Sequence, residues 1–597
     1  MISENDNQKN PFAVQTPEGL SAKNVVSLFV DVFADFELVK NQGHTFLNGP
    51  RGSGKSMMFR YLEPDCQQLA TDKPSQDLPF FAVHVPIKNT RLNLTEIEKL
   101  CTSHAEALIA EHYMVLVVLS RCINSLKRTG VPNEDQSVKA LRKFCCEELP
   151  SIFAAIGNNY QFEPIPENTN GEHLVEWLER LLALMLEKLS TYLKKIAFPG
   201  ADLTYSGPIG NFVDLLCPFI NEFRKLPFLP DGPIYLLIDD ADNLSDTQTR
   251  ILNEWVATRS TEDVCLKVST QLRYKTFRTI TGGAISTPHD YDEINISNVY
   301  TSNRSRYMQR MCSIVKKRLS LYNFKCTPEE FFPVHQVQEK KIERIKRAYL
   351  DKGDDAARGA RASDDSTRYA RPDYIKELSD RRGGLQQYSY SGFKQLVHIS
   401  SGVIRHFLDS AAEMYAEEKV KNGNVKRISP EIQNQVIRNH ADQLFFREFD
   451  KILMDEAPSP DELKPFIRMR KLVEALGTIF FEVLKSDASE RRIFSIALSD
   501  SDDQEVLDVL DLGVQYGYFH KSSMGTKKFA SRTPLYILTR RLAPFFSLDP
   551  TSFAGYQSIS TSDLREAMEN QKSFTRKFSQ KKKLGSELNA DQGKLPL

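Results

Sequence analysis

The stretch FLNGPRGSGKSMMFRYL, residues 46–62, decides the fold. It contains three glycines within six residues and closes on a Lys-Ser pair before an apolar run. Glycine permits backbone angles and a close approach that a Cβ would block, so successive N–H groups can converge on phosphate oxygens. The phosphate-loop pattern G-x-x-x-x-G-K-[ST] is complete over Gly49, Pro50, Arg51, Gly52, Ser53, Gly54, Lys55 and Ser56.

The surroundings of this loop also suit a nucleotide. Residues 44–48, HTFLN, are typical of a short buried strand, and residues 56–62 are typical of the start of a helix. In that geometry Lys55 reaches the terminal phosphates, Ser56 offers its hydroxyl to Mg2+, and the positive end of the helix faces the anion. Loop, strand and helix together favour ATP and Mg2+ binding over a chance glycine-rich turn.

A carboxylate pair follows a second apolar strand in IYLLIDDADNLS, residues 234–245. By position we expect Asp239 to hold Mg2+ through water and Asp240 to polarise the attacking water. Taken alone, an Asp-Asp turn at a strand end is more often an ordinary solvated turn. The upstream phosphate loop makes a metal site the better hypothesis, with Asp242 as an alternative base.

Two further segments offer polar groups. The predicted strand CLKVSTQ, residues 265–271, ends in Thr270 and Gln271, which could sense the γ-phosphate or hold water; ordinary capping of a strand end is an equal alternative. A Ser-Ser-Gly turn within 394–415 precedes a helix that carries Arg405 near its start. Such an arginine can reach phosphate oxygens, although a lone arginine more often forms a surface ion pair.

The composition restricts the class of protein. Among 597 residues, Lys plus Arg and Asp plus Glu both number 78, so no global basic field argues for nucleic acid. The nine cysteines include no C-x-x-C pair, which favours reduced thiols over a disulfide framework or zinc site. The polar start and the short apolar run 113–119 predict a cytoplasmic chain without a membrane span.

Along the chain, the pattern predicts an α/β P-loop NTPase: a parallel-sheet core with a large helical insertion, a helical lid and a C-terminal winged-helix-like domain. The expected segments are 1–91 and 229–300 for the two parts of the core, 92–228 for the insertion, 301–455 for the lid with a flexible insertion at 351–372, 456–555 for the winged-helix-like domain, and 556–597 for a disordered basic tail.

These residues together resemble the AAA+ and STAND branch of P-loop ATPases, most closely prokaryotic proteins of the origin-recognition-complex type. The supporting stretches are GPRGSGKS at 49–56, LLIDDADNLS at 236–245, CLKVSTQ at 265–271 and SSGVIRHFLD at 400–409. The resemblance implies that Arg405 is a second nucleotide sensor. It also implies a homo-oligomer in which a neighbour's arginine, Arg273 or Arg278, completes the site. Asp240 stands where relatives carry Glu, so slow hydrolysis is expected.

The C-terminal pattern is typical of a winged helix: helix 463–485, strand 493–498, helix 503–517, and a hairpin over 517–532 that turns at 522–525. The second helix carries four acids and no Lys or Arg, which predicts repulsion from phosphates. Cations of the wing and its flank leave a sequence-independent DNA contact open; they are Lys521, Lys527, Lys528, Arg532, Arg540 and Arg541. Docking of a protein is slightly favoured.

Three functions compete on this basis. The leading one is a slowly hydrolysing, oligomeric ATP switch that acts on a protein partner encoded nearby, and the family resemblance also allows a place in antiviral defence. The second is a DNA-associated ATPase of the initiator or transposition-accessory type. The third, a nucleotide kinase, is least favoured, because kinases that share the loop pattern are compact and lack a lid and C-terminal module of this kind.

Overall fold

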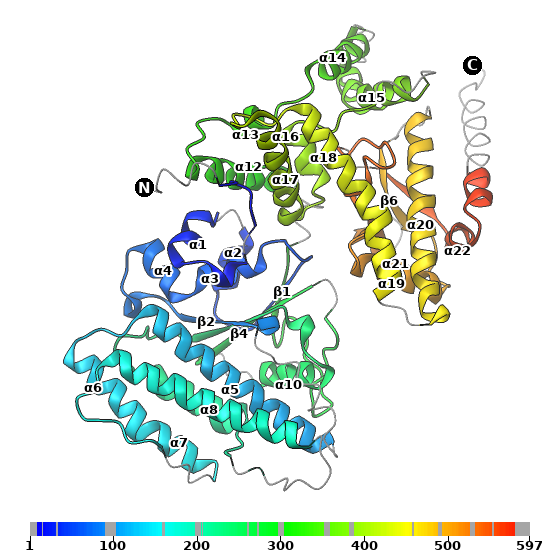
Figure 1. Cartoon of the computed structure of the whole chain (residues 1–597). Coiled ribbons are helices and arrows are strands. Elements are labelled where there is room, and N and C mark those ends of the chain that lie inside the picture. Colours follow the sequence, from blue (N-terminus) through cyan, green and yellow to red (C-terminus); the bar gives the residue numbers. More distant parts are fainter. Residues whose placement is uncertain are drawn as a thin grey trace. The chain divides into compact units, whose positions relative to one another are not determined.

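The computed structural model describes residues 9–14, 16–30, 34–89, 103–157, 162–196, 205, 207–258, 262–271, 274–296, 304–351, 359–380, 387–455, 459–486, 492–525, 532–551 and 555–578. The chain forms two compact units (Figure 1). The N-terminal unit is Gln15–Ile296, and the C-terminal unit combines Ser297–Leu597 with Met1–Val14. Each unit is described by itself.

A five-stranded parallel sheet organises the N-terminal unit, in the order β2-β3-β4-β1-β5. Its strands are β1 (Thr45–Asn48), β2 (Phe81–Pro86), β3 (Ile234–Asp239), β4 (Val264–Thr270) and β5 (Asp292–Asn295). Strands β2, β3 and β4 are buried throughout, as expected for parallel strands covered on both faces. Because β4 lies between β1 and β3, the loop after β1 and the turn after β3 meet on one sheet edge. The α/β parallel-sheet prediction is confirmed.

Short helices cover one face of this sheet. They are α1 (Ala22–Leu28), α2 (Ala34–Lys40), α3 (Lys55–Leu62) and α4 (Pro64–Thr71). Met58 and Phe59 of α3 pack in one buried cluster with Leu47 of β1 and Leu237 of β3. The apolar residues after the phosphate loop therefore anchor its helix directly to the two strands that flank the predicted site.

The predicted insertion covers the opposite face. Its helices are α5 (Ser103–Thr129), α6 (Asp135–Lys143), α7 (Leu149–Ala155), α8 (Gly171–Ile196) and α9 (Cys217–Phe223), and α10 (Asp246–Ala257) packs beside them. Leu119 and Ile123 of α5 share one buried cluster with Val83 of β2 and Leu236 of β3. The run 113–119 is thus core, and the insertion shares its hydrophobic core with the sheet.

Both halves of α5 are also bonded to elements near the phosphate loop. Near its C-terminal end, Arg128 lies 3.0 Å from Glu63, the buried residue that follows α3. In its first half, Glu111 accepts a 2.9 Å hydrogen bond from the indole of Trp255 on α10. Helix α5 therefore links the helix that follows the phosphate loop to the helix that follows the Asp-Asp turn.

The first part of the C-terminal unit is helical. Its helices are α12 (Arg304–Leu321), α13 (Pro328–Phe331), α14 (Gln336–Asp351), α15 (Gly359–Asp380), α16 (Phe393–Ile399), α17 (Ile404–Asn422), α18 (Pro430–Asp442) and α19 (Phe449–Asp455). The N-terminal Phe12 packs against Phe331 and Phe332, and Arg318 donates a 2.9 Å hydrogen bond to the carbonyl of Pro11. Pro11 and Phe12 thus pack in this unit, although the sequence placed them with the sheet.

The prediction that 351–372 is a flexible insertion is wrong from residue 359 onward, where α15 begins. This helix packs on α14, and Arg371 fixes the pair through hydrogen bonds of 2.8 and 2.9 Å to the carboxylate of Glu339. The segment was expected to be flexible because charged residues dominate its sequence. Alanine and arginine favour helices, and Ala370 and Tyr374 provide the buried contacts. Residues 352–358 lie outside the described part.

The winged-helix-like domain follows. It comprises α20 (Pro460–Lys485), β6 (Ile493–Leu498), α21 (Gln504–Gln515), β7 (Phe519–Gly525), β8 (Arg532–Leu538), β9 (Gly555–Ile559) and α22 (Thr561–Glu569), and its sheet has the order β7-β8-β6-β9. The hairpin was expected to turn at 522–525. That position is wrong, because Gly525 pairs with Arg532 and strand β7 continues through residue 525. Residues 526–531 lie outside the described part.

The predicted disordered tail, 556–597, is also wrong in its first part. Strand β9 pairs in parallel with β6, and α22 packs on α20. Helical residues continue over 571–578, where Phe574 is buried. The many basic residues obscured the pattern of Leu564, Met568 and Phe574, whose buried side chains anchor this segment. Residues 579–597 lie outside the described part. Among the helices of the described chain, none combines the length and hydropathy that a membrane span requires.

Candidate functional site

The phosphate loop has the backbone geometry that its glycines predict. Gly52 and Gly54 have φ angles of +86° and +105°, in the region that residues with a Cβ rarely adopt. Helix α3 begins at Lys55, immediately after Gly54. The N–H groups of the first turn of α3 therefore open toward the loop, where an anion is favoured.

Lys55 is held inside this loop with only 5% of its surface exposed. Its ammonium group donates hydrogen bonds of 2.6 Å to the carbonyl of Gly49 and 3.2 Å to that of Pro50. Burial lowers the pKa of Lys55, against the opposing effect of nearby carboxylates, Asp239 first. A desolvated cation interacts strongly with an incoming anion. The Ser53 hydroxyl is buried without a hydrogen-bond partner, so phosphate oxygens suit this cradle.

Asp239 ends β3 and is 2% exposed. One carboxylate oxygen, Oδ1, accepts a hydrogen bond from the hydroxyl of Ser269 on β4, and Oδ2 lies 3.2 Å from Nε2 of His84 on β2. Burial raises the pKa of Asp239, but His84 and the hydroxyls of Ser269 and Ser56 outweigh it and lower the pKa to about 2. The carboxylate is therefore ionised and fixed beside the Ser56 hydroxyl, as a Mg2+ site requires.

Asp240 adopts a left-handed conformation with φ of +58°, which turns the chain sharply after β3. Its amide donates a 2.9 Å hydrogen bond to Ser269 Oγ, so Ser269 holds both aspartates. The Asp240 carboxylate is partly exposed and lies 3.5 Å from the ammonium group of Lys88, just beyond β2. It is accessible to water, but a cation competes for its charge.

Asp242 is a site residue that the sequence offered only as an alternative base. Its Oδ2 accepts a 2.6 Å hydrogen bond from the Gln271 amide, while Oδ1 is buried without a partner. Burial raises the pKa of Asp242, against the Gln271 hydrogen bond and the charge of Lys55, which lower it. The D-D-A-D spacing was the available signal, because one turn after β3 brings the third aspartate back toward β4.

Thr270 lies where a sensor was predicted, at the end of β4 beside the phosphate loop. It is fully buried, and its hydroxyl bonds to the Asn48 side chain, just before Gly49. Its carbonyl accepts a 3.2 Å hydrogen bond from the Gly49 amide. Gln271 contributes its backbone amide, to Asp242, as stated above. The strand end thus connects the phosphate loop with the acidic turn. This arrangement is compatible with a γ-phosphate sensor and with ordinary capping of the strand end.

The three predicted arginines lie in different parts of the chain. Arg278 is exposed in a turn beyond β4, where its backbone pairs with Ala284. Arg273 lies outside the described residues. Arg405 occupies the second position of α17 in the C-terminal unit, after a turn in which Ser401 and Gly402 have positive φ angles. The predicted order of helix, turn and helix is correct there, and the sensor role of Arg405 stays a prediction.

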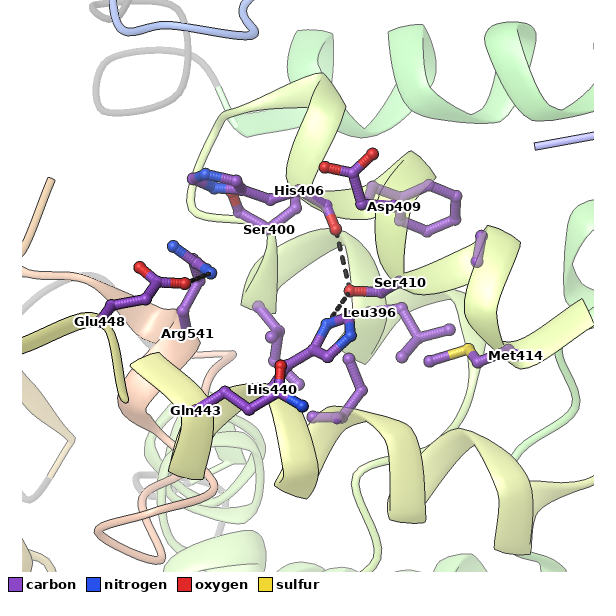
Figure 2. A pocket seen from close by; sticks show the side chains of 14 residues that line it. Leu396, Ser400, His406, Asp409, Ser410, Met414, His440, Gln443, Glu448 and Arg541 are labelled. Carbon is purple, nitrogen blue, oxygen red and sulfur yellow. Dashed lines mark hydrogen bonds and ion pairs between the residues drawn. The ribbon is translucent and has the colours of Figure 1, made fainter. Parts of the chain in front are cut away.

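A cavity of about 180 Å3 lies along the same helix, between α17 and α18 (Figure 2). His440 bridges two residues of α17, with Nε2 2.6 Å from Glu413 and Nδ1 3.0 Å from the Ser410 hydroxyl. This grouping has the composition of a hydrolase triad. Ser410, however, donates its hydrogen at 2.9 Å to the carbonyl of His406, so the hydroxyl is an acceptor toward His440 and not an activated nucleophile.

The charges of the winged-helix-like domain differ from the sequence expectation. Asp503, which caps α21, and Glu505 of α21 pair with Arg565 of α22 at 2.6 and 2.9 Å, and Arg468 of α20 also contacts Glu505. The acidic helix is therefore partly neutralised by arginines from two other helices. Its predicted repulsion of phosphates is weaker than the isolated segment suggested.

Several of the expected DNA-contacting cations are engaged within the domain. Arg540 is 2% exposed, donates to the Pro550 carbonyl at 3.1 Å and lies over the Phe494 ring, so it is structural. Lys521 pairs with Asp511 at 2.9 Å, and Arg541 lies 3.6 Å from Glu448. Lys527 and Lys528 lie outside the described residues, and only the backbone of Arg532 is described.

Comparison with known proteins adds a family. The ORC-CDC6-like family model matches residues 10–557. Two solved structures are similar at 10% identity: Cdc6p from Pyrobaculum aerophilum, with a TM-score of 0.28 over 96% of this chain and 99% of that one, and the Orc1 protein of Aeropyrum pernix in complex with DNA, with a TM-score of 0.25 over 92% and 96%. At these TM-scores neither structure carries an argument about this chain.

No curated protein sequence matches the chain. The family match nevertheless takes in the phosphate loop, the acidic turn, the helical segments and most of the winged-helix-like domain. It agrees with the resemblance that the site motifs indicated. The chain therefore belongs to the ORC-CDC6-like family.

Proposed function

We propose that this protein is an ATPase that binds ATP with Mg2+ in the N-terminal unit and works as a slow, nucleotide-dependent switch. One observation carries the proposal: the buried Lys55 and the ionised, doubly anchored Asp239 lie on the same edge of the sheet, beside Ser56. A desolvated cation and a fixed carboxylate are the groups that phosphates and Mg2+ need. Membership of the ORC-CDC6-like family supports the same activity.

In this proposal each residue has a defined task. Lys55 and the loop amides hold the phosphates, while Ser56 and Asp239 hold Mg2+. Asp240 polarises the attacking water. Its side chain is one methylene shorter than Glu, and Lys88 lies 3.5 Å from it, so hydrolysis is slow. The nucleotide brings the negative charge of its phosphates, and the protein positions these phosphates and compensates their charge.

The switch also needs partners. The site resembles sites completed by a neighbouring subunit, so we propose a homo-oligomer in which Arg273 or Arg278 contacts the neighbour's γ-phosphate and Arg405 acts within its own subunit. The switch acts on a protein partner encoded nearby. Antiviral defence is the proposed setting, supported by the resemblance of the motifs to STAND ATPases. Loss of protection against phage in cells that carry K55A would support that setting, and unchanged protection would refute it.

Substitution of Lys55 tests the ATP site. K55A removes a charge-assisted contact to the phosphates, so nucleotide binding should weaken at least tenfold while the fold is kept. Binding of a fluorescent ATP analogue should be measured for the wild-type protein, K55A and the control K139A. Lys139 pairs with Asp135 on the exposed face of α6, away from the loop. Equal affinity in all three folded proteins would refute the proposed function.

Association with DNA is a second candidate, favoured by the compensation of the acidic residues of α21. Any duplex contact should then come from backbone-binding cations, ignore base sequence and weaken steeply with salt. Affinity for two unrelated duplexes should be measured across salt concentrations for the wild type and for a variant with Lys527 and Lys528 both changed to Glu. Sequence-selective binding that persists at high salt would show direct base reading instead, and no binding at low salt would leave the protein-docking alternative.

A further inference from the structure

A buried histidine touches the proposed metal-binding carboxylate. His84 lies on β2, 5% exposed, and pairs in register with Leu237 of β3, two residues before Asp239. His84 and Asp239 point to the same face of the sheet as Leu237, since alternate residues of a strand share a face. The contact between His84 Nε2 and Asp239 Oδ2, at 3.2 Å, therefore crosses between neighbouring strands.

This contact completes the support of Asp239. Ser269 on β4 bonds to Oδ1 and His84 on β2 bonds to Oδ2, so the carboxylate at the end of β3 is held by both neighbouring strands. A carboxylate with both oxygens bonded cannot rotate freely about its side-chain torsions. The imidazole is itself confined, because the Phe59 ring packs edge-on at 6.3 Å and every residue of β2 is buried.

We propose that His84 is a positioning residue for Mg2+ binding, acting through Asp239. The inference rests on the proposed ATPase function and concerns the same site. By donating Nε2–H to Oδ2, the imidazole fixes the carboxylate in the orientation that serves the metal beside Ser56. Loss of hydrogen bonds to metal-binding groups typically lowers metal affinity by about 10-fold to 100-fold.

A competing arrangement uses the same residues differently. Single ligand atoms of Glu18, His84 and Asp239 all lie within 4.8 Å of one another, so His84 could in principle bind a metal directly. The hydrogen bond is the better assignment, because a 3.2 Å contact already satisfies Nε2 and Asp239 is bonded on both oxygens. The two roles differ in what replaces imidazole: a glutamine amide can donate a hydrogen bond, but it is a poor ligand for the metals that imidazole binds.

The test measures how strongly Mg2+ tightens nucleotide binding. Affinity for a fluorescent ATP analogue is determined in EDTA and across a Mg2+ titration, for the wild type, H84L and H84Q. In H84L the affinity in EDTA should stay near the wild-type value, while the Mg2+ concentration for half-maximal tightening should rise about tenfold or more. H84Q should recover most of the wild-type response, because its amide replaces the donor.

His44 provides a matched control. It is also a histidine buried in this sheet, 3% exposed, but its Nδ1 accepts a hydrogen bond from the Leu266 amide at 3.0 Å, and it serves no part of the proposed metal site. H44Q should keep the wild-type Mg2+ response even where its stability falls. S269A, which removes the other anchor of Asp239, should reproduce the Mg2+ defect and keeps the idea testable where H84L fails to fold.

The outcomes separate the two proposals. A wild-type Mg2+ response in folded H84L would overturn the positioning role and leave the ATPase proposal intact. A defect in H84Q as large as that in H84L would also overturn it, in favour of direct metal binding by the imidazole. Failure of the wild-type protein to bind the ATP analogue at all would instead refute the proposed function on which the inference rests.

Discussion

The hydroxyl of Ser401 accepts a 2.6 Å hydrogen bond from the backbone amide of Arg540. Ser401 belongs to the turn before α17, three residues ahead of the first residue of the helix that carries Arg405, and Arg540 follows β8. Thr539, next to Arg540, donates its amide to the Tyr518 carbonyl at 2.9 Å. The turn before the predicted sensor helix is thus bonded to the base of the β7–β8 hairpin.

Removal of the Ser401 hydroxyl should loosen that hairpin base. Ser401 has a φ of +53°, so S401G keeps the backbone conformation without strain while it deletes the side chain that carries the hydroxyl. The Arg540 amide, buried and then unbonded, should exchange hydrogen faster, and stability should fall by about 1–3 kcal/mol. Hydrogen–deuterium exchange at residues 539–541 measures it. Unchanged exchange in S401G would show that the contact contributes nothing to the order of the hairpin base.

Substitution of Asp240 should change the hydrolysis rate without changing ATP affinity. D240N removes the proposed base and should lower phosphate release by about 100-fold or more. D240E extends the carboxylate toward the water and should raise the rate. D242N serves as the comparison, since Asp242 bonds to the Gln271 amide and should mainly affect stability. If D242N stops hydrolysis and D240N does not, the base is Asp242.

An arginine of one subunit should complete the site of the next. Alanine at Arg273 or at Arg278, whichever contacts the neighbour, should spare ATP binding and abolish hydrolysis. Mixing that variant with K55A should restore part of the activity. At some mixed interfaces, the intact Lys55 site of one subunit meets the intact arginine of its neighbour. Phosphate release of the mixtures and sedimentation with and without ATP measure these effects. A monomer under all conditions would contradict the prediction.

Acid should destabilise the N-terminal unit through His112. This side chain is fully buried, and burial lowers its pKa to about 4, against the effect of the Gly210 backbone, which raises it. The unfolded chain binds a proton near pH 6.5 and the folded chain does not, so the free energy of unfolding should fall as the pH drops from 6.5 to 4 and stay flat above 6.5.

The variant H112Q should reduce that slope by up to one proton, which is about 1.4 kcal/mol per pH unit. Urea unfolding of the full chain can be followed by tryptophan fluorescence, because Trp177 and Trp255 are the only tryptophans and both lie in the N-terminal unit. Parallel pH curves for the wild type and H112Q would show that His112 titrates alike in both states.

Local pattern was sufficient for part of this structure. The phosphate loop, the apolar strand before Asp239 and the turn before α17 all follow from adjacent residues, and the structure has each where it was predicted. The parallel sheet also follows, since buried apolar strands alternate with helices.

The features that the sequence did not predict depend on contacts between distant segments. His84 meets Asp239 only because β2 and β3 are neighbours, and Arg565 neutralises Asp503 across more than sixty residues of chain. Neither pairing leaves a local spacing signal. The helix from residue 359 and the ordered segment through 578 were missed for the same reason: their many charges masked a few apolar residues whose packing partners lie elsewhere.

Two contacts of α5 connect the insertion to the helices on either side of the proposed site. Because Arg128 holds the end of α3 and Glu111 holds α10, a shift of α5 along its axis displaces the helix behind Lys55 and the helix behind Asp240 together. Its middle shares a core with β2 and β3, so α5 cannot slide without repacking the sheet. The insertion is therefore part of the structural support of this sheet, and cutting out 103–223 would leave one face of the sheet exposed to water.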